Sequence, residues 1–301
     1  MTDHPSEFAD RPPPVGPPTN LIPPPSEPVS GLPTEPAPIF SSSDVHASAS
    51  VDASMGARKV RPWWGLGDVA MAVPLIIFAS VIGALLATPF AGVDDLTDAD
   101  QLATSSAILI GGLFAQQLVQ GFWPVVVSKW KGFGPRRDWG LTIKPIDLLY
   151  GPLIAIAAMI AAGIVGQAVA TAVSLADGNE ASNVQILSDA ADSPWLYALL
   201  FAVVIGAPVT EEIFFRGLVM RAFQKRGGDL LAVVGSSAVF ALPHMIDTTV
   251  DGLAVLLSSI FTVGLVLALV ALKTKRLGPP IVAHILFNAT SAAAAVGWIS
   301  F

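Results

Sequence analysis

The chain contains no cysteine and little charge: only 13% of its 301 residues are Asp, Glu, Lys or Arg, whereas 53% are hydrophobic. The lack of cysteine excludes disulfides, thiolate metal ligands and a cysteine nucleophile. A soluble domain carries about 25% charged residues, so roughly half of the expected charge is missing. This deficit, together with long apolar runs, predicts a membrane-embedded protein. No basic stripe is present, so a nucleic-acid partner is not expected.

The first 57 residues differ from the rest in composition. They hold 13 of the 25 prolines, all before Ile39, and MTDHPSEFAD has neither the basic nor the apolar part of a signal peptide. Proline supplies no amide donor and fixes φ, which favours extended polyproline II over a packed core. We expect a disordered, Pro-rich cytoplasmic tail over 1–57; docking of an SH3-like or WW-like partner is the alternative.

Residues 58–301 predict an all-α, polytopic transmembrane helical bundle of about seven spans. Each apolar segment is long enough to cross a bilayer as a helix, although the fifth is short. The expected spans are 68–90, 105–127, 148–176, 195–220, 230–246, 253–272 and 280–299.

The connections between these spans alternate in charge. Basic residues occur in 58–61, 129–144, 221–228 and 273–276, whereas 92–101, 176–194 and 247–252 are acidic or neutral. The positive-inside rule then predicts a cytoplasmic N-terminus and an external C-terminus, with the cell (plasma) membrane as the expected location. The seven tryptophans fall near span ends or in loops, where interfacial aromatics are expected.

Three charged residues lie inside an apolar span: Glu211, Glu212 and Arg216. Unpaired, they would cost on the order of 8–10 kcal/mol in a bilayer. Glu212 and Arg216 are four residues apart on one helical face, which predicts an ion pair that fixes helix packing. Glu211 lies about 100° around the helix without a local cation. A desolvated carboxylate of this kind suits a general base.

Two histidines occupy other apolar segments. His244 ends the run FALPH, and His284 begins HILFN, with Asn288 one turn further on the same face. A single membrane histidine often only hydrogen-bonds between helices, but two of them beside a carboxylate pair favour a common site. At about 1.5 Å per residue, their depths agree loosely with that of Glu211. We expect them to converge in a cavity that opens towards the cytoplasm.

Several intramembrane hydrolase patterns are missing. The sequence has no H-E-x-x-H zinc motif, no G-x-G-D motif and no G-x-S-x-G elbow. Without a cysteine or a credible serine nucleophile, activated water is the simplest attacking group.

The runs EEIFFR (211–216), FALPH (240–244) and HILFN (284–288) resemble the three motifs of the CPBP family, which covers CAAX prenyl endopeptidases and bacteriocin-processing or Abi-type membrane proteins. The resemblance covers about 195–301 and implies an intramembrane endopeptidase with its site between helices. It implies Glu211 as the base, His244 as its assistant, and His284 and Asn288 as donors to an oxyanion. Arg216 would orient Glu212, and Phe240 would shape the His244 pocket.

A metal stays open at this point. Glu211, His244 and His284 could equally form a three-ligand zinc site with water in the fourth position, and the family is often labelled metalloprotease for that reason. Asn288 beside His284 favours the metal-free version, because an amide suits an oxyanion hole better than zinc.

The expected partners are membrane lipid and a peptide or membrane-protein substrate. Nothing in the sequence indicates a prenyl ligand. A non-catalytic membrane scaffold or bacteriocin-immunity protein on the same fold is the alternative. A small transporter with Glu211 as proton carrier ranks last, because it does not explain His284 with Asn288, and no internal repeat suggests inverted halves.

Overall fold

The computed structural model describes residues 62–92, 105–173, 187–188, 190–245 and 250–299. The predicted tail over 1–57 lies outside these residues. Every regular element within them is helical, which confirms the all-α prediction. In chain order they are α2 (Leu66–Ala87), η1 (Thr88–Phe90), α4 (Ser106–Lys131), α5 (Pro135–Asp138), α6 (Asp147–Ala172), α8 (Leu196–Phe201), η2 (Ala202–Gly206), α9 (Ala207–Glu211), η3 (Glu212–Val219), α10 (Met220–Ala241), η4 (Leu242–His244), α11 (Val250–Thr274) and α12 (Gly278–Ala295).

Five helical stretches of the described chain are long and apolar enough to cross a membrane: 66–90, 106–131, 147–172, 196–244 and 252–274. Four of them match expected spans within a few residues. The fourth, 196–244, covers the fourth and fifth expected spans together. The seventh expected span corresponds to α12, an 18-residue helix that is not among the five.

The stretch 196–244 is not one straight rod. A continuous helix of 49 residues would extend about 70 Å, more than twice the hydrocarbon core. Inside α10, Gly227 (φ −146°) and Gly228 (φ 72°) leave the helical region. The chain folds back there, which brings Gly235 close to Phe223. A Cβ on Gly235 would lie 3.2 Å from the Phe223 ring. The break falls between the fourth and fifth expected spans.

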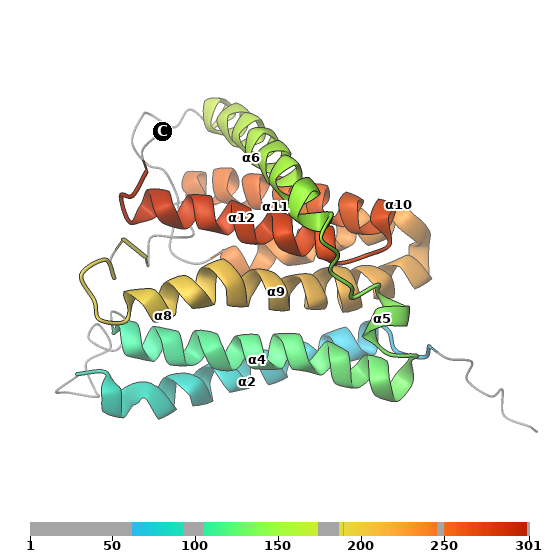
Figure 1. The fold of residues 1–301 in the computed structure, drawn as a ribbon, viewed down its shortest axis with the longest axis horizontal. Helices are drawn as coiled ribbons and strands as arrows, with labels where there is room; N and C mark the ends of the chain where they lie inside the picture. The colour runs from blue at the N-terminus through green and yellow to red at the C-terminus, as the bar shows by residue number, and fades with distance from the viewer. Residues whose placement is uncertain (1–61, 93–104, 174–186, 189, 246–249, 300–301) are drawn as a thin grey trace, which may run out of the picture. The chain divides into compact units, whose positions relative to one another are not determined.

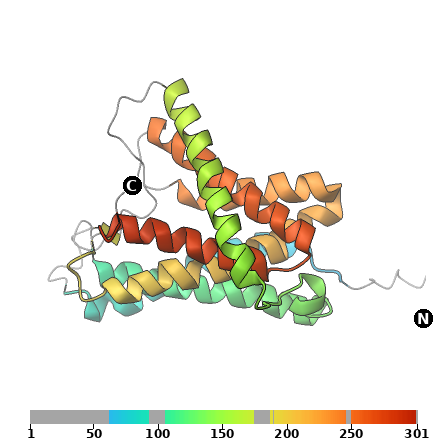
Figure 2. The same cartoon turned by 45° about the horizontal axis from the view of Figure 1, so that its top comes forward.

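Small residues allow helices such as α2 and α4, which lie side by side in Figure 1, to approach closely. A Cβ on Gly83 of α2 would lie 2.2 Å from the carbonyl oxygen of Gly111 in α4. Helix α6 crosses over α11 and α12 (Figure 2), and a Cβ on Gly151 would lie 2.3 Å from Val282 of α12. Such contacts are typical of membrane helices, where no hydrophobic effect drives association and backbones must approach closely.

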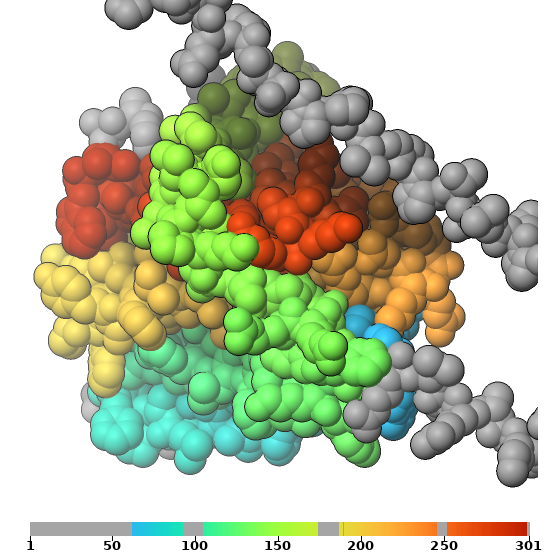
Figure 3. Space-filling view, turned by 45° about the vertical axis from the view of Figure 1, so that its right-hand side comes forward, coloured from blue at the N-terminus to red at the C-terminus, as the bar shows by residue number. Residues whose placement is uncertain are grey.

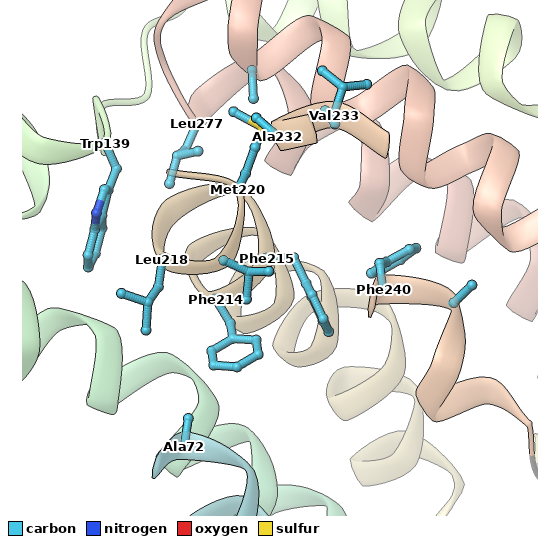
Figure 4. Packing of buried hydrophobic residues seen from close by; sticks show 14 of the residues in the cluster. Ala72, Trp139, Phe214, Phe215, Leu218, Met220, Ala232, Val233, Phe240 and Leu277 are labelled. Carbon is cyan, nitrogen blue, oxygen red and sulfur yellow. The ribbon is translucent and has the colours of Figure 1, made fainter. Parts of the chain in front are cut away.

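The central core surrounds η3. Phe214, Phe215 and Leu218 of this element are buried, with Met220 directly after it and Phe240 of α10 beside it (Figure 4). This segment therefore lies deep among the other helices, and it carries Glu212 and Arg216 of the EEIFFR run, whereas Glu211 ends α9.

Two tryptophans correct the expectation of an interfacial belt. Trp139 is 1% exposed and Trp64 is also buried. The Trp139 ring covers Gly217 of η3, where a Cβ would lie 3.1 Å from it, and packs edge-on against Trp64. The connection between α4 and α6 is thus anchored into the core, a tertiary contact that a loop sequence does not reveal.

We predict that Gly228→Ala destabilises the protein by about 1–3 kcal/mol, because φ 72° with ψ −165° is accessible almost only to glycine. A Cβ there would meet nothing within 4 Å, so the loss would report backbone strain alone. The measurement is reversible unfolding in detergent. Gly163→Ala is the matched control, since that helical glycine of α6 also has open space but no positive φ. Equal stability of the two variants would contradict the role of Gly228.

Candidate active site

A cavity of about 140 Å³ brings the predicted site residues together. Glu211 at the end of α9, His244 at the end of η4, and His284 and Asn288 of α12 all line it, together with Phe240. These residues are far apart in the sequence and come from three separate apolar segments. The described chain therefore forms a cavity, with these polar side chains among mostly apolar lining residues, where the sequence predicted a shared site.

His284 lies between the two adjacent glutamates. Its Nδ1 is 3.0 Å from Oε1 of Glu212, and its Nε2 is 3.7 Å from Oε2 of Glu211. The ring is buried and fixed by the hydrogen bond to Glu212, whereas Glu211 lies beyond hydrogen-bond distance. The sequence predicted Arg216 as the only partner of Glu212, and the contact with His284 was not predicted. The adjacency of the two glutamates was the sequence signal for this contact, because adjacent side chains can lie on either side of one imidazole ring.

Arg216 completes the cluster, and the predicted i,i+4 pair is present. Its Nη1 lies 2.8 Å from Oε1 of Glu212, and both side chains are almost wholly buried. Nη2 donates to the carbonyl oxygen of Gly264 in α11 at 3.2 Å. The guanidinium also lies 4.4 Å from the ring centroid of Phe240, within cation–π range. The ion pair therefore ties η3 to α10 and α11.

Phe240 is the aromatic centre of the site. It is 2% exposed, and its ring centroid lies 5.5 Å from that of His244 and 5.7 Å from that of His284. Phe215 packs edge-on against its other side at 5.1 Å. Nδ1 of His244 lies 3.2 Å from the carbonyl oxygen of Phe240. Phe240 thus positions both histidines, through its ring and its backbone.

Two π-helical stretches shape the segment that carries the glutamates. Element η2 precedes α9, and η3 begins at Glu212 directly after Glu211. The side chain of Glu211 keeps 16% of its area accessible, whereas Glu212 has none. The π-helix is rare and often occurs at functional sites. Nothing in the sequence pattern announced it, because apolar periodicity only distinguishes α-helix from strand.

Neighbouring helices supply donors to the carbonyl groups of η2. Asn288 Nδ2 donates to the carbonyl oxygen of Val203 at 2.8 Å, and Nε2 of the buried Gln117 in α4 donates to that of Ala202 at 3.0 Å. An amide nitrogen carries two hydrogens, so Asn288 retains one for another acceptor. The sequence analysis did not identify Gln117, although a polar side chain in an apolar span is a visible signal.

The geometry does not favour the zinc alternative. In the described part of the chain, no three His, Asp or Glu side chains converge as ligands of one ion. Both nitrogens of His284 face glutamates, and Nδ1 of His244 faces a backbone carbonyl oxygen. In this arrangement the donor set of the described residues does not fit a three-ligand site.

The apolar helices define an integral membrane protein, and the cavity between them is its candidate site. Residues 193–290 match the family model of the type II CAAX prenyl endopeptidases, Rce1-like. This segment includes all three motifs, and the match confirms the resemblance to CPBP intramembrane proteases that the motifs predicted. Neither the curated proteins nor the solved structures contained a match to the chain.

We predict that Arg216→Met costs about 3–5 kcal/mol of stability, because it leaves the buried Glu212 carboxylate without its cation. Adding Glu212→Gln removes that charge and should recover a large part of the loss. The measurement is a double-mutant cycle of unfolding in detergent. Additive losses in the double variant would mean that the two side chains stabilise the protein independently.

Proposed function

We propose that the protein is a glutamate-dependent intramembrane endopeptidase that hydrolyses a peptide bond of a membrane-associated peptide or protein with activated water. The observation that carries this proposal is the placement of His284 between Glu211 and Glu212 at a cavity that His244 and Asn288 also line. The family match supports CAAX-type intramembrane protease activity in general.

Glu211 and His244 are suited to activate the water. Glu211 is the accessible carboxylate of the pair and faces the cavity. With Nδ1–H of His244 donating to the Phe240 carbonyl, its Nε2 keeps a lone pair that accepts a hydrogen bond from water. Glu211 takes one proton from the water while the water oxygen attacks the scissile carbonyl carbon. The π electrons of the C=O bond then move onto the carbonyl oxygen.

His284 and Asn288 would then stabilise the oxyanion. Nδ1–H of His284 donates to the Glu212 carboxylate, so donation from Nε2 as well requires both ring nitrogens to carry hydrogen. Asn288 offers the amide hydrogen that Val203 does not use. When the intermediate collapses, the C–N bond breaks and the amine leaves with the proton held by Glu211. Fixed donors of this kind favour the charge that develops in the transition state.

Arg216 and Glu212 are positioning residues in this scheme. Neither of them lines the cavity, but they fix the ring of His284 and the direction of the segment that bears Glu211. Phe240 does the same for His244.

The membrane topology is a separate part of the proposal and rests on the charges of the connections. We place the N-terminus in the cytoplasm, the C-terminus outside and the protein in the plasma membrane, on the alternation of basic and acidic connections. The 1–57 tail would then be free to meet a cytoplasmic partner.

A non-catalytic scaffold or bacteriocin-immunity protein is the second candidate. The buried Glu212, Arg216 and His284 alone would serve such a protein as a packing cluster. An accessible Glu211 has no purpose in that cluster, which favours the enzyme.

We predict that Glu211→Gln abolishes proteolysis, with a loss of at least about 10²–10⁴-fold, because it removes the base and keeps the side-chain size. Wild type and variant are expressed in membranes of a strain lacking the protein, and new peptide termini are compared by mass spectrometry. Asp192→Asn is the matched control, since it removes an exposed carboxylate outside the cavity. Equal sets of termini from folded, abundant proteins would favour the scaffold.

We also predict that purified protease retains activity after treatment with 1,10-phenanthroline, because no three potential ligands converge in the described residues. The readout is cleavage of a substrate that the terminus experiment identifies. Loss of cleavage that added zinc restores would overturn the metal-free mechanism while leaving the protease assignment intact.

A further inference from the structure

A second cavity, of about 500 Å³, lies at the end of the bundle that carries the basic connections. Its lining comes from the α5 connection, the turn inside α10 and the end of α11. Figure 3 shows the green and orange segments to which these parts belong. Its charged lining consists of Arg136, Arg137, Arg221, Lys275, Asp138 and Asp229. Four cations therefore face two carboxylates.

Both carboxylates accept hydrogen bonds from uncharged groups of the protein. Asp138 Oδ2 accepts hydrogen bonds from Trp64 Nε1 at 3.1 Å and from the hydroxyl of Ser128. Asp229 Oδ1 accepts from Gln224 Nε2 at 2.7 Å. Among the described residues, no carboxylate lies within ion-pair distance of any of the four cations. Asp229 attracts Arg221 without contacting it, but the described lining holds more cations than carboxylates.

Arg221 supplies a buried donor. Its Nη1 donates to Gln224 Oε1 at 2.9 Å, but its Nε is inaccessible to solvent and has no hydrogen-bond partner in the described chain. Its Nη2 donates to the carbonyl oxygen of Ala271 in α11 at 3.5 Å. These contacts hold the guanidinium in the wall of the cavity, where its charge adds to those of the other three basic residues.

Lys275 is held at the cavity by an unfavourable backbone. It is the one non-glycine residue of the described chain with positive φ, at 53°. The turn is pinned to Gly140, whose carbonyl oxygen accepts from the Leu277 amide at 3.0 Å and whose missing Cβ would lie 2.0 Å from the Lys275 carbonyl oxygen. Strained residues persist where the surroundings fix them, often at ligand sites.

We propose that this cavity binds a phosphate group, supplied by the headgroup of an anionic phospholipid. Guanidinium groups match phosphate oxygens in geometry, and basic pockets between membrane helices bind anionic headgroups. The Arg137 guanidinium lies 5.9 Å from the ring centroid of Phe133, a side chain more than half exposed at the end of α4. A cation beside an exposed aromatic ring suits the lipid interface, which favours a lipid over soluble phosphate.

The test measures lipid binding to the detergent-solubilised full-length protein by native mass spectrometry. The probes are phosphatidylglycerol, phosphatidylcholine with the same acyl chains, and inorganic phosphate. Wild type should bind phosphatidylglycerol more tightly than phosphatidylcholine. Arg136→Gln/Arg137→Gln should weaken phosphatidylglycerol binding on the order of 10- to 30-fold, from the typical contribution of two basic residues near a membrane surface.

Lys129→Gln/Arg226→Gln is the matched control, because it removes the same charge from exposed positions outside the cavity. Equal weakening in both double variants would overturn the site and leave a diffuse electrostatic effect. So would equal binding of the two lipids by wild type. Binding of inorganic phosphate that only the cavity variant loses, without any lipid preference, would keep the phosphate site and overturn its assignment to a headgroup.

Discussion

The buried ion pair of Glu212 and Arg216 is the constraint on which the rest of the structure depends. Neither side chain reaches solvent, so each would impose a large desolvation penalty alone. The pair is compensated by groups from other helices: the Gly264 carbonyl of α11, the Phe240 ring of α10 and the His284 ring of α12. Because every one of these contacts lowers the cost of the same two charges, four helical segments are fixed relative to one another around the cavity.

This arrangement gives two neighbouring glutamates different environments. The π-helical η3 begins at Glu212, which turns into the core, whereas Glu211 stays at the cavity. Glu212 holds His284 through Nδ1 and thereby sets which nitrogen faces Glu211. The structural role of one carboxylate thus prepares the proposed chemical role of the other. A single glutamate could not do both, since the Glu212 side chain that contacts Arg216 and His284 is fully buried and cannot reach a water in the cavity.

Much of the fold could be predicted from the sequence because membrane spans depend on local hydropathy, and the candidate site because charge inside apolar runs is costly enough to be noticed. Other features depend on tertiary contacts. The second partner of Glu212 requires the register of α12 against η3. The burial of Trp139 requires Gly217 to lie beneath it. The π-helical turns require donors from Gln117 and Asn288. None of these contacts has a periodicity, so the sequence can mark a polar residue in an apolar span but cannot identify its partner.

The two cavities share one continuous helical segment, which raises the question of whether they communicate. Glu211 and Arg221 lie about 15 Å apart along it, and Trp139, which lines the basic cavity, packs on Gly217 of η3. Coupling would require η3 to have two discrete arrangements that both sites bias. The complete burial of Glu212, Arg216 and Leu218 argues against a second arrangement, because rotation would break the ion pair and its contacts to α10, α11 and α12. A headgroup at the basic end would therefore anchor the protein in its membrane without altering the chemistry at Glu211.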